Sequence, residues 1–135
     1  MIVVDTSAIV AILYDEPERL PFTDIILSAS AAKMSVASLL EARIVLHFDA
    51  GQDAIMALDS LLLKSRIELL EVSPQMADIA FTAYCQYGKG TGSSAKLNYG
   101  DCFAYALAKH LNLPLLFKGN DFSQTDLVAA VDIFG

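Results

Sequence analysis

The sequence contains little cysteine and no long apolar run. Its two cysteines, Cys85 and Cys102, form neither a metal-binding spacing nor a disulfide framework, which favours reduced thiols packed in the helices of a cytoplasmic protein. The longest uninterrupted apolar run, Ala8 to Tyr14, is far shorter than the ~20 residues that a membrane-spanning helix needs. No cationic leader precedes it, so neither a membrane span nor a secretory signal is expected.

Positive charge is also scarce. The chain has 9 Lys and Arg residues against 16 Asp and Glu residues, which gives a formal net charge of −7. This balance argues against the broad basic face that binds nucleic acids non-specifically, but it leaves room for a site in which metal ions carry the positive charge. The two histidines, His47 and His110, have no second ligand at a usable spacing, so no Cys/His metal site is indicated.

Apolar residues, by contrast, are abundant. They make up 55% of the 135 residues, and the mean hydropathy is +0.48. This length is typical of one domain with a substantial core, so we expect a single domain over residues 1–135. The large apolar content belongs either in that core or in a contact with another protein.

The first seven residues combine a buried strand with a carboxylate. Ile2, Val3 and Val4 are β-branched and apolar, which suits a short strand buried on both faces of a parallel sheet. Asp5 stands where that strand should end, and Thr6-Ser7 open a predicted helix. Because ligands of open α/β sheets bind beyond the carboxyl ends of the strands, Asp5 is placed either for chemistry or simply to cap the helix.

The rest of the chain alternates predicted helices with short predicted strands. Helices are expected over 22–32, 37–48, 54–63, 74–87 and 102–111, and strands over 33–36, 67–72 and 113–117. Residues 88–96 are rich in glycine and serine and predict a loop, and the tail from Val128 to Ile133 could hold a last edge strand. This order predicts a three-layer α/β/α sandwich with a mostly parallel central sheet.

Four acids from separate segments are expected at one edge of that sheet: Asp5, Glu41, Asp101 and Asp121. Each also has a structural explanation, since Ser38-x-x-Glu41 fits a capping box and Asp101 falls in the first turn of a helix that Asn98 would cap. Carboxylates gathered in one place repel each other, and a divalent cation would relieve that repulsion. Mg²⁺ and Mn²⁺ prefer such oxygen ligands.

Four segments together resemble the motifs of the PIN-domain nucleases. They are Asp5-Thr6-Ser7, Ser35 to Glu41, Asn98 to Ala108, and Leu115 to Phe122 with Thr125-Asp126. The last segment resembles the closing motif of the VapC-type toxin branch of that family. The resemblance covers nearly the whole chain and implies a PIN-like fold and a Mg²⁺- or Mn²⁺-dependent endoribonuclease that leaves 5′-phosphate and 3′-hydroxyl ends and is neutralised by a small VapB-type antitoxin.

The resemblance also assigns roles to residues. Asp5, Glu41 and Asp101 match the family's acidic metal site, and Asp121 is the best match for the fourth acid, with Asp126 a weaker substitute. Many relatives carry Thr-x-Asp where this chain has Lys118-Gly119-Asn120. Asn120 could therefore act as a neutral ligand. Ser7 matches a hydroxyl residue that hydrogen-bonds a metal ligand or water.

Few cations are available to hold RNA. Lys118 is the best candidate because it lies beside the expected site, and Lys89 and Lys96 on the loop could close over a substrate; for each, a solvated surface charge is the alternative. The apolar stripes of the first helices could receive an antitoxin segment or a second copy of the chain in a homodimer, or could simply form the core.

Other classes of protein fit less well. A catalytically silent PIN-like binding module would share these features, and the residues at Gly119 and Asn120 keep it open. A phosphorelay receiver needs paired acids after its first strand, where this chain has Asp5 followed by Thr6. A haloacid-dehalogenase-type phosphatase needs Asp-x-Asp, but Ser7 takes the second position.

Overall fold

The structure is a computed structural model that describes all residues 1–135. Its centre is a four-stranded sheet in the order β3-β2-β1-β4, and every pair of neighbouring strands is parallel. The strands are β1 (Ile2–Val4), β2 (Ala32–Ser35), β3 (Glu68–Leu70) and β4 (Leu115–Leu116). The predicted mostly parallel sheet is therefore confirmed.

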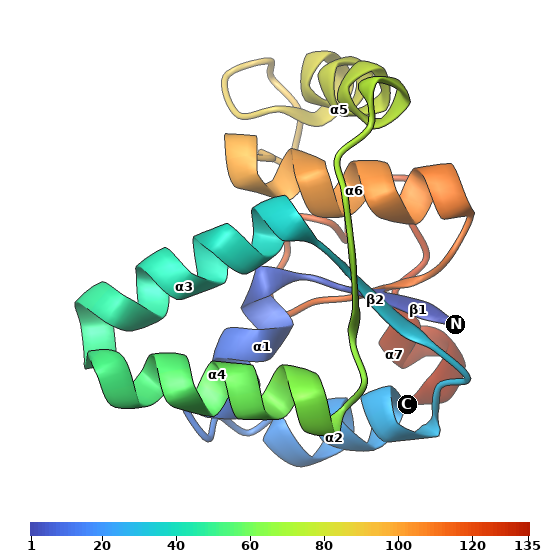
Figure 1. Cartoon of the computed structure of the whole chain (residues 1–135). Coiled ribbons are helices and arrows are strands. Elements are labelled where there is room, and N and C mark those ends of the chain that lie inside the picture. Colours follow the sequence, from blue (N-terminus) through green and yellow to red (C-terminus); the bar gives the residue numbers. More distant parts are fainter.

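Seven helices surround the sheet. They are α1 (Thr6–Leu13), α2 (Arg19–Ser28), α3 (Val36–Ala50), α4 (Gln52–Lys64), α5 (Pro74–Tyr87), α6 (Tyr99–Leu111) and α7 (Ala130–Phe134). Helices α5 and α6 lie on one side of the sheet, and α1, α2 and α4 lie on the other (Figure 1). The sheet is thus the middle layer of a three-layer sandwich, from which the α3–α4 hairpin projects to one side.

Alternation along β1 divides the core between the two faces of the sheet. Ile2 and Val4 belong to a cluster with residues of α1, α2, α3 and α4, whereas Val3 belongs to a second cluster with residues of α5 and α6. All three side chains are fully buried. A strand buried on both faces needs apolar residues at successive positions, which explains the Ile-Val-Val run.

The capping residues set where the helices begin. Ser73 caps α5 by accepting a hydrogen bond from the backbone N–H of Met76, and Pro74 follows at the first helical position, so α5 begins and ends as predicted. Asn98 caps α6, which begins at Tyr99, three residues before the predicted start at Cys102. The predicted elements are confirmed in number and order up to β4.

Two predictions about the chain are wrong. After β4 the chain meets the sheet only through one pairing, Leu115 with Ala129, and then turns into α7, whose Ala130 is fully buried. No edge strand therefore forms over residues 128–133. Cys85 is exposed on α5 instead of packed, whereas Cys102 is buried as expected. None of the helices combines the length and apolarity that crossing a membrane requires.

The order of the strands in the sheet changes direction next to β1. From β1 the chain proceeds to β2 on one side, while β4 pairs with the other side of β1. At such a reversal the connections leave in opposite directions and open a crevice beyond the carboxyl ends of the strands. Asp5 follows β1 at this point, and Lys118 follows β4.

Candidate functional site

Hydrogen bonds to one carboxylate oxygen hold the Asp5 side chain, and the other carboxylate oxygen has no hydrogen-bond partner. Its Oδ2 accepts hydrogen bonds from the backbone N–H of Ser7 at 3.0 Å and from the Ser7 hydroxyl at 2.6 Å. Asp5 therefore caps α1, as its structural explanation required. Its Oδ1, however, is buried and has no hydrogen-bond partner. A buried carboxylate oxygen without a partner is costly, so a capping role alone does not account for this residue.

Ser7 joins Asp5 to the end of β4. Its hydroxyl donates to Asp5 Oδ2 and accepts a hydrogen bond from the backbone N–H of Lys118 at 3.0 Å. The backbone N–H of Asp5 in turn donates to the carbonyl of Leu116. These bonds hold the carboxylate of Asp5 at a fixed place between two strands.

Asp101 occupies the first turn of α6 within a capping box. Its Oδ2 accepts from the backbone N–H of Asn98 at 3.0 Å, and Asn98 Oδ1 accepts from the backbone N–H of Asp101 at 2.8 Å. This reciprocal pair satisfies two N–H groups at the start of the helix and fixes the direction of the Asp101 side chain. Asp101 is 9% exposed.

The capping explanation for Glu41 is wrong. Helix α3 begins at Val36, and its cap is Ser35, which accepts from the backbone N–H of Ala37. Glu41 consequently lies well inside the helix, out of reach of the first backbone N–H groups. Its carboxylate instead packs against α6, where a Cβ added to Gly100 would stand 2.1 Å from Glu41 Oε2. Glycine at this position leaves room for the carboxylate.

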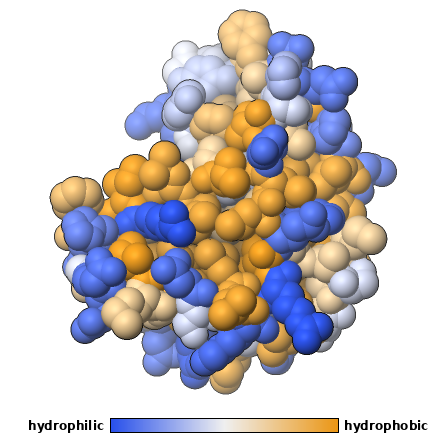
Figure 2. All heavy atoms as spheres, in the orientation of Figure 1, coloured by the Kyte–Doolittle hydropathy of each residue, from blue (hydrophilic) through white to orange (hydrophobic).

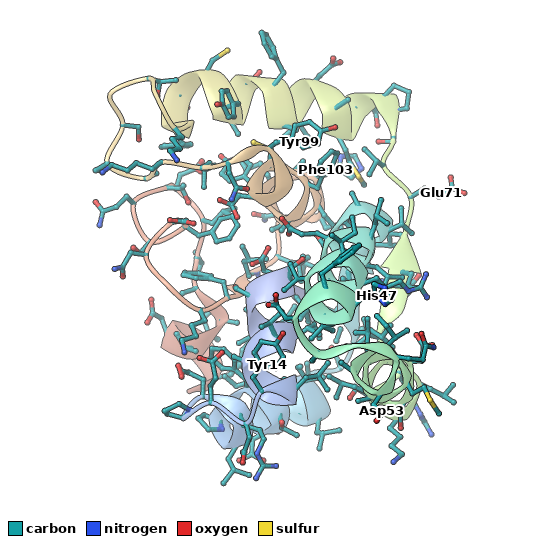
Figure 3. The ribbon with its side chains drawn as sticks, turned by 90° about the vertical axis from the view of Figure 1, so that its left-hand side faces the viewer. Tyr14, His47, Asp53, Glu71, Tyr99 and Phe103 are labelled. Carbon is teal, nitrogen blue, oxygen red and sulfur yellow. The ribbon has the colours of Figure 1, made fainter.

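These side chains line one cavity of about 330 Å³ at the crevice beyond β1. Its wall is formed by Asp5, Thr6, Ser7, Val10, Glu16, Glu41, Val45, Asp101 and Lys118. Figure 3 looks onto the side of the molecule where α1, α3 and α6 come together, marked by Tyr14, His47 and Tyr99. Three acids that lie far apart in the sequence therefore meet in one place.

Burial makes two of these carboxyls poor acids. It raises the pKa of Asp5 from its ordinary 3.8 to about 6, with the charge of Glu41 adding to the rise and the hydrogen bonds from Ser7 opposing it. Burial likewise raises the pKa of Asp101 to about 7, opposed by the Asn98 N–H and assisted by the charges of Asp5, Asp121 and Glu41. Carboxylates in this situation gain from a nearby cation.

The chemistry of this cavity fits a hard divalent cation. Oxygen is the donor atom in every acid of its wall, and Asp5 Oδ1 is buried without a partner. No group of three or more His, Cys, Asp or Glu side chains is arranged to hold a metal ion directly. Mg²⁺ usually keeps several of its waters and takes one or two carboxylates directly, so the remaining acids of the wall would contact such an ion through water.

Lys118 lines the cavity, but its ammonium is already paired. It forms an ion pair with Glu16 and a second one, at 3.3 Å, with Glu18. Both acids lie between α1 and α2, so the pairs join this connection to the chain after β4. Hydrogen bonding to Glu16 raises the pKa of Lys118 above its ordinary value, which keeps the ammonium charged.

The candidates for the fourth acid lie in different places. Asp121 is exposed and does not line the cavity, although its charge contributes to the raised pKa of Asp101. Asn120 is also exposed, and its carbonyl accepts from the Ser123 hydroxyl. Asp126 instead accepts hydrogen bonds from Tyr105 and Lys109, both at 2.5 Å, and lines a separate cavity between α5 and α6.

Sequence reasoning missed Thr6, Val10, Glu16 and Val45 in the cavity wall, and Gly100 beside Glu41. Glu16 belongs to Asp15-Glu16-Pro17-Glu18, a segment that predicts only an interruption between helices, yet its side chain lines the cavity. Gly100 precedes Asp101 and leaves the space that Glu41 fills. A glycine in the first turn of a helix was a usable signal, because glycine there weakens the helix unless space is required. Nothing in the local pattern around Glu16 marked it.

Comparisons with known proteins identify the family of this chain. The family model for the PIN domain matches residues 2–128. The chain is 42% identical over 132 residues to "VapC ribonuclease Mb0625" of Mycobacterium bovis, which covers 96% of this chain and 98% of that protein. It is 46% identical over 127 residues to "Ribonuclease VapC" of Mycolicibacterium smegmatis, covering 94% and 98%. A solved structure of VapBC2 from Rickettsia felis, bound to a DNA fragment from their promoter, has a TM-score of 0.75 at 17% identity, covering 96% and 97%.

The chain therefore belongs to the PIN domain family. Within that family its relatives at 42% and 46% identity are VapC ribonucleases, matched over almost their whole length, so it is a member of the VapC group. This membership confirms the resemblance seen in the motifs and sets aside the receiver and phosphatase interpretations.

Proposed function

We propose that this chain is a divalent-metal-dependent endoribonuclease that hydrolyses RNA phosphodiester bonds in the cavity beyond β1. One observation carries the proposal: Asp5, Glu41 and Asp101 line the same cavity, and Asp5 Oδ1 is buried there without a partner. The relatives' names, which describe ribonucleases, support the choice of RNA as the substrate.

Asp5, Glu41 and Asp101 would hold Mg²⁺ or Mn²⁺. When bound, such an ion would act as a Lewis acid toward a phosphate and would lower the pKa of a water molecule. Asp5 offers its unpaired Oδ1, while Ser7 keeps Oδ2 in place. Asp101 is held by its capping box and Glu41 by its contact with Gly100, so each acid has its own support.

Asp121 acts from the rim of the site. Its charge reaches Asp101, and its exposure leaves it free to orient a water molecule or to complete the ligands of a metal ion once RNA is bound. Asn120, its neighbour, offers a neutral oxygen in the same place. Asp126 does not take this role, because its carboxylate is committed to Tyr105 and Lys109.

Binding of RNA depends on few cations. Lys118 lines the cavity and provides a charge to which a phosphate can bind. Lys89 and Lys96 are exposed on the loop between α5 and α6 and can approach a substrate from that side. A protein with a net charge of −7 cannot hold RNA through a broad basic face, so a bound metal ion would strengthen the binding of RNA in the cavity.

The partners we propose are a VapB-type antitoxin and a second copy of the chain. Large apolar side chains are exposed along α3 at Leu40, Ile44 and Phe48, with 59%, 51% and 82% of their surface accessible. Figure 2 shows apolar side chains gathered across the middle of the face drawn there. Exposed apolar area of this kind is typical of protein interfaces, and a solved toxin-antitoxin complex from Klebsiella pneumoniae contains a chain of similar fold.

The test is an RNA cleavage assay with the purified, antitoxin-free chain. Wild type should cleave RNA with Mg²⁺ or Mn²⁺ and stop when EDTA is added, and Asp5→Asn and Asp101→Asn should lose at least 100-fold in rate, as is typical when metal ligands or charge-stabilising groups are removed (about 10² or more). Equal cleavage by wild type and both variants would overturn the proposal. A wild type that binds Mn²⁺ and RNA without cleaving would favour the silent binding module.

A further inference from the structure

The cavity wall contains one cation, and two acids outside the predicted metal site hold it. Among the residues that line the cavity, Lys118 alone is basic, and its ammonium pairs with Glu16 and Glu18. Glu16 itself lines the cavity, so this ion pair lies at the site and not behind it. A single ammonium shared by two carboxylates leaves the group of three with a net negative charge.

This arrangement affects how a phosphate approaches. RNA brings negative charge into a cavity that already has Asp5, Glu41, Asp101 and Glu16 in its wall. Without a neighbouring acid, Lys118 would attract the phosphate and release a counterion on binding. With Glu16 and Glu18 in contact, its charge is already neutralised and one of its N–H donors is engaged by Glu16.

The Lys118 ammonium can leave Glu16 or Glu18 without a change in the Lys118 backbone. The backbone of Lys118 is fixed independently, because its N–H donates to the Ser7 hydroxyl. The side chains of Lys118, Glu16 and Glu18 remain partly accessible, with 36%, 32% and 28% of their surface exposed. Partly exposed ion pairs are weak, so a phosphate can compete for the lysine.

We propose that Glu16 and Glu18 limit the affinity of this chain for RNA by occupying Lys118, so that an RNA phosphate binds in the cavity by displacing a glutamate from the ammonium. This inference rests on the proposed function for its ligand, RNA. It makes Glu16 and Glu18 residues that act through Lys118, and it assigns a role to the connection between α1 and α2.

The experiment measures binding of a short single-stranded RNA in EDTA, over a series of salt concentrations, so that cleavage does not interfere. Glu16→Gln should bind the RNA about fivefold more tightly at low salt, the equivalent of losing one partly exposed ion pair. The slope of log affinity against log salt should become steeper by at most about 0.7, the value of one phosphate contact to a single strand, because the displaced glutamate of wild type takes up a cation and offsets part of the counterion release. Asp15→Asn is the matched control, since Asp15 is the adjacent residue but pairs with Arg19.

Lys118→Met separates this effect from general repulsion. In the Lys118→Met background, Glu16→Gln should tighten RNA binding no more than Asp15→Asn does, and the salt slope should not change. If Glu16→Gln acts equally in both backgrounds, or leaves the salt slope of the wild type unchanged, the inference is wrong. Because binding is measured without metal, that result would leave the proposed nuclease activity untouched, and a failure of cleavage would not alter the binding result.

Discussion

The carboxylate of Glu41 lies in the space that a side chain on Gly100 would occupy. A Cβ at position 100 would stand 2.1 Å from Glu41 Oε2 and 3.1 Å from Oε1. Gly100 is therefore the residue that allows an acid from α3 to reach the first turn of α6, next to Asp101. The two helices meet at the site through this contact.

Substituting Gly100 should impair the site without weakening the fold. In Gly100→Ala the flexible end of Glu41 must move away, while alanine favours a helix over glycine by roughly 0.5–1 kcal/mol. We expect an unchanged or slightly raised Tm, together with at least a tenfold loss of Mn²⁺ affinity measured by calorimetry. Adding Gly100→Ala to Glu41→Gln should cause no further loss of affinity; a further loss would show that Gly100 acts through something other than Glu41.

Removing the Ser7 hydroxyl should make Asp5 a still weaker acid. The hydrogen bonds from Ser7 lower the pKa of Asp5, so Ser7→Ala should raise that pKa further above 6. Cleavage should then decline at a higher pH than in wild type as the solution is acidified. Ser7→Thr keeps a hydroxyl and should retain the wild-type profile. An identical pH profile for Ser7→Ala and wild type would contradict the role of this hydrogen bond.

The metal-free protein should lose stability as the pH rises from about 4 to 7. The pKa values of Asp5 and Asp101, about 6 and about 7, lie above the ordinary value of 3.8, so the folded chain binds their protons more tightly than the unfolded chain. Each carboxyl thus penalises folding progressively until the pH passes its folded-state pKa. Thermal unfolding should show a decline of several degrees over this range relative to Asp5→Asn.

Divalent ions supply the control for that measurement. Addition of Mn²⁺ at pH 7.5 should raise the Tm of wild type and have little effect on Asp5→Asn, because a ligand stabilises only the folded state that binds it. The same pH dependence in wild type and Asp5→Asn would assign the decline to other groups.

Substitution of Asp126 should affect stability, whereas substitution of Asp121 should affect catalysis. Asp126→Asn weakens its bonds to Tyr105 and Lys109, so it should lower the free energy of unfolding by about 1 kcal/mol and leave kcat within a factor of two or so. Asp121→Asn should lower kcat without changing the free energy of unfolding, since Asp121 is exposed. The opposite pattern in denaturant titration and kinetics would make Asp126 the fourth acid.

Local patterns predicted much of this fold. Ile2–Val4 is a strand because three β-branched residues in succession suit a doubly buried position, and Ser73-Pro74 set the start of α5. The Ser38-x-x-Glu41 pattern failed because the helix starts earlier, at the competing cap Ser35. The predicted edge strand in the tail does not form, because a single pairing to Leu115 is followed directly by helix α7. The apolar spacing of Val128 and Val131 does not distinguish a strand from a helical turn.

The site residues that local patterns predicted are those that directly follow a strand or lie in the first turn of a helix. Asp5 and Asp101 stand at such positions, and the structure brings both into one cavity with Glu41. The ion pair between Glu16 and Lys118 could not be predicted, because it joins segments far apart in the chain and no periodicity encodes which surface charges meet. The contact between Gly100 and Glu41 is of the same kind.

The most direct test of this account is a calorimetric titration of Mn²⁺ into the wild-type chain and into Asp5→Asn at pH 7. Wild type should bind Mn²⁺ saturably and release protons, because ligand carboxyls of raised pKa must ionise, and Asp5→Asn should bind at least tenfold more weakly. Binding of equal strength in both proteins, or none in wild type, would contradict a metal site built on Asp5.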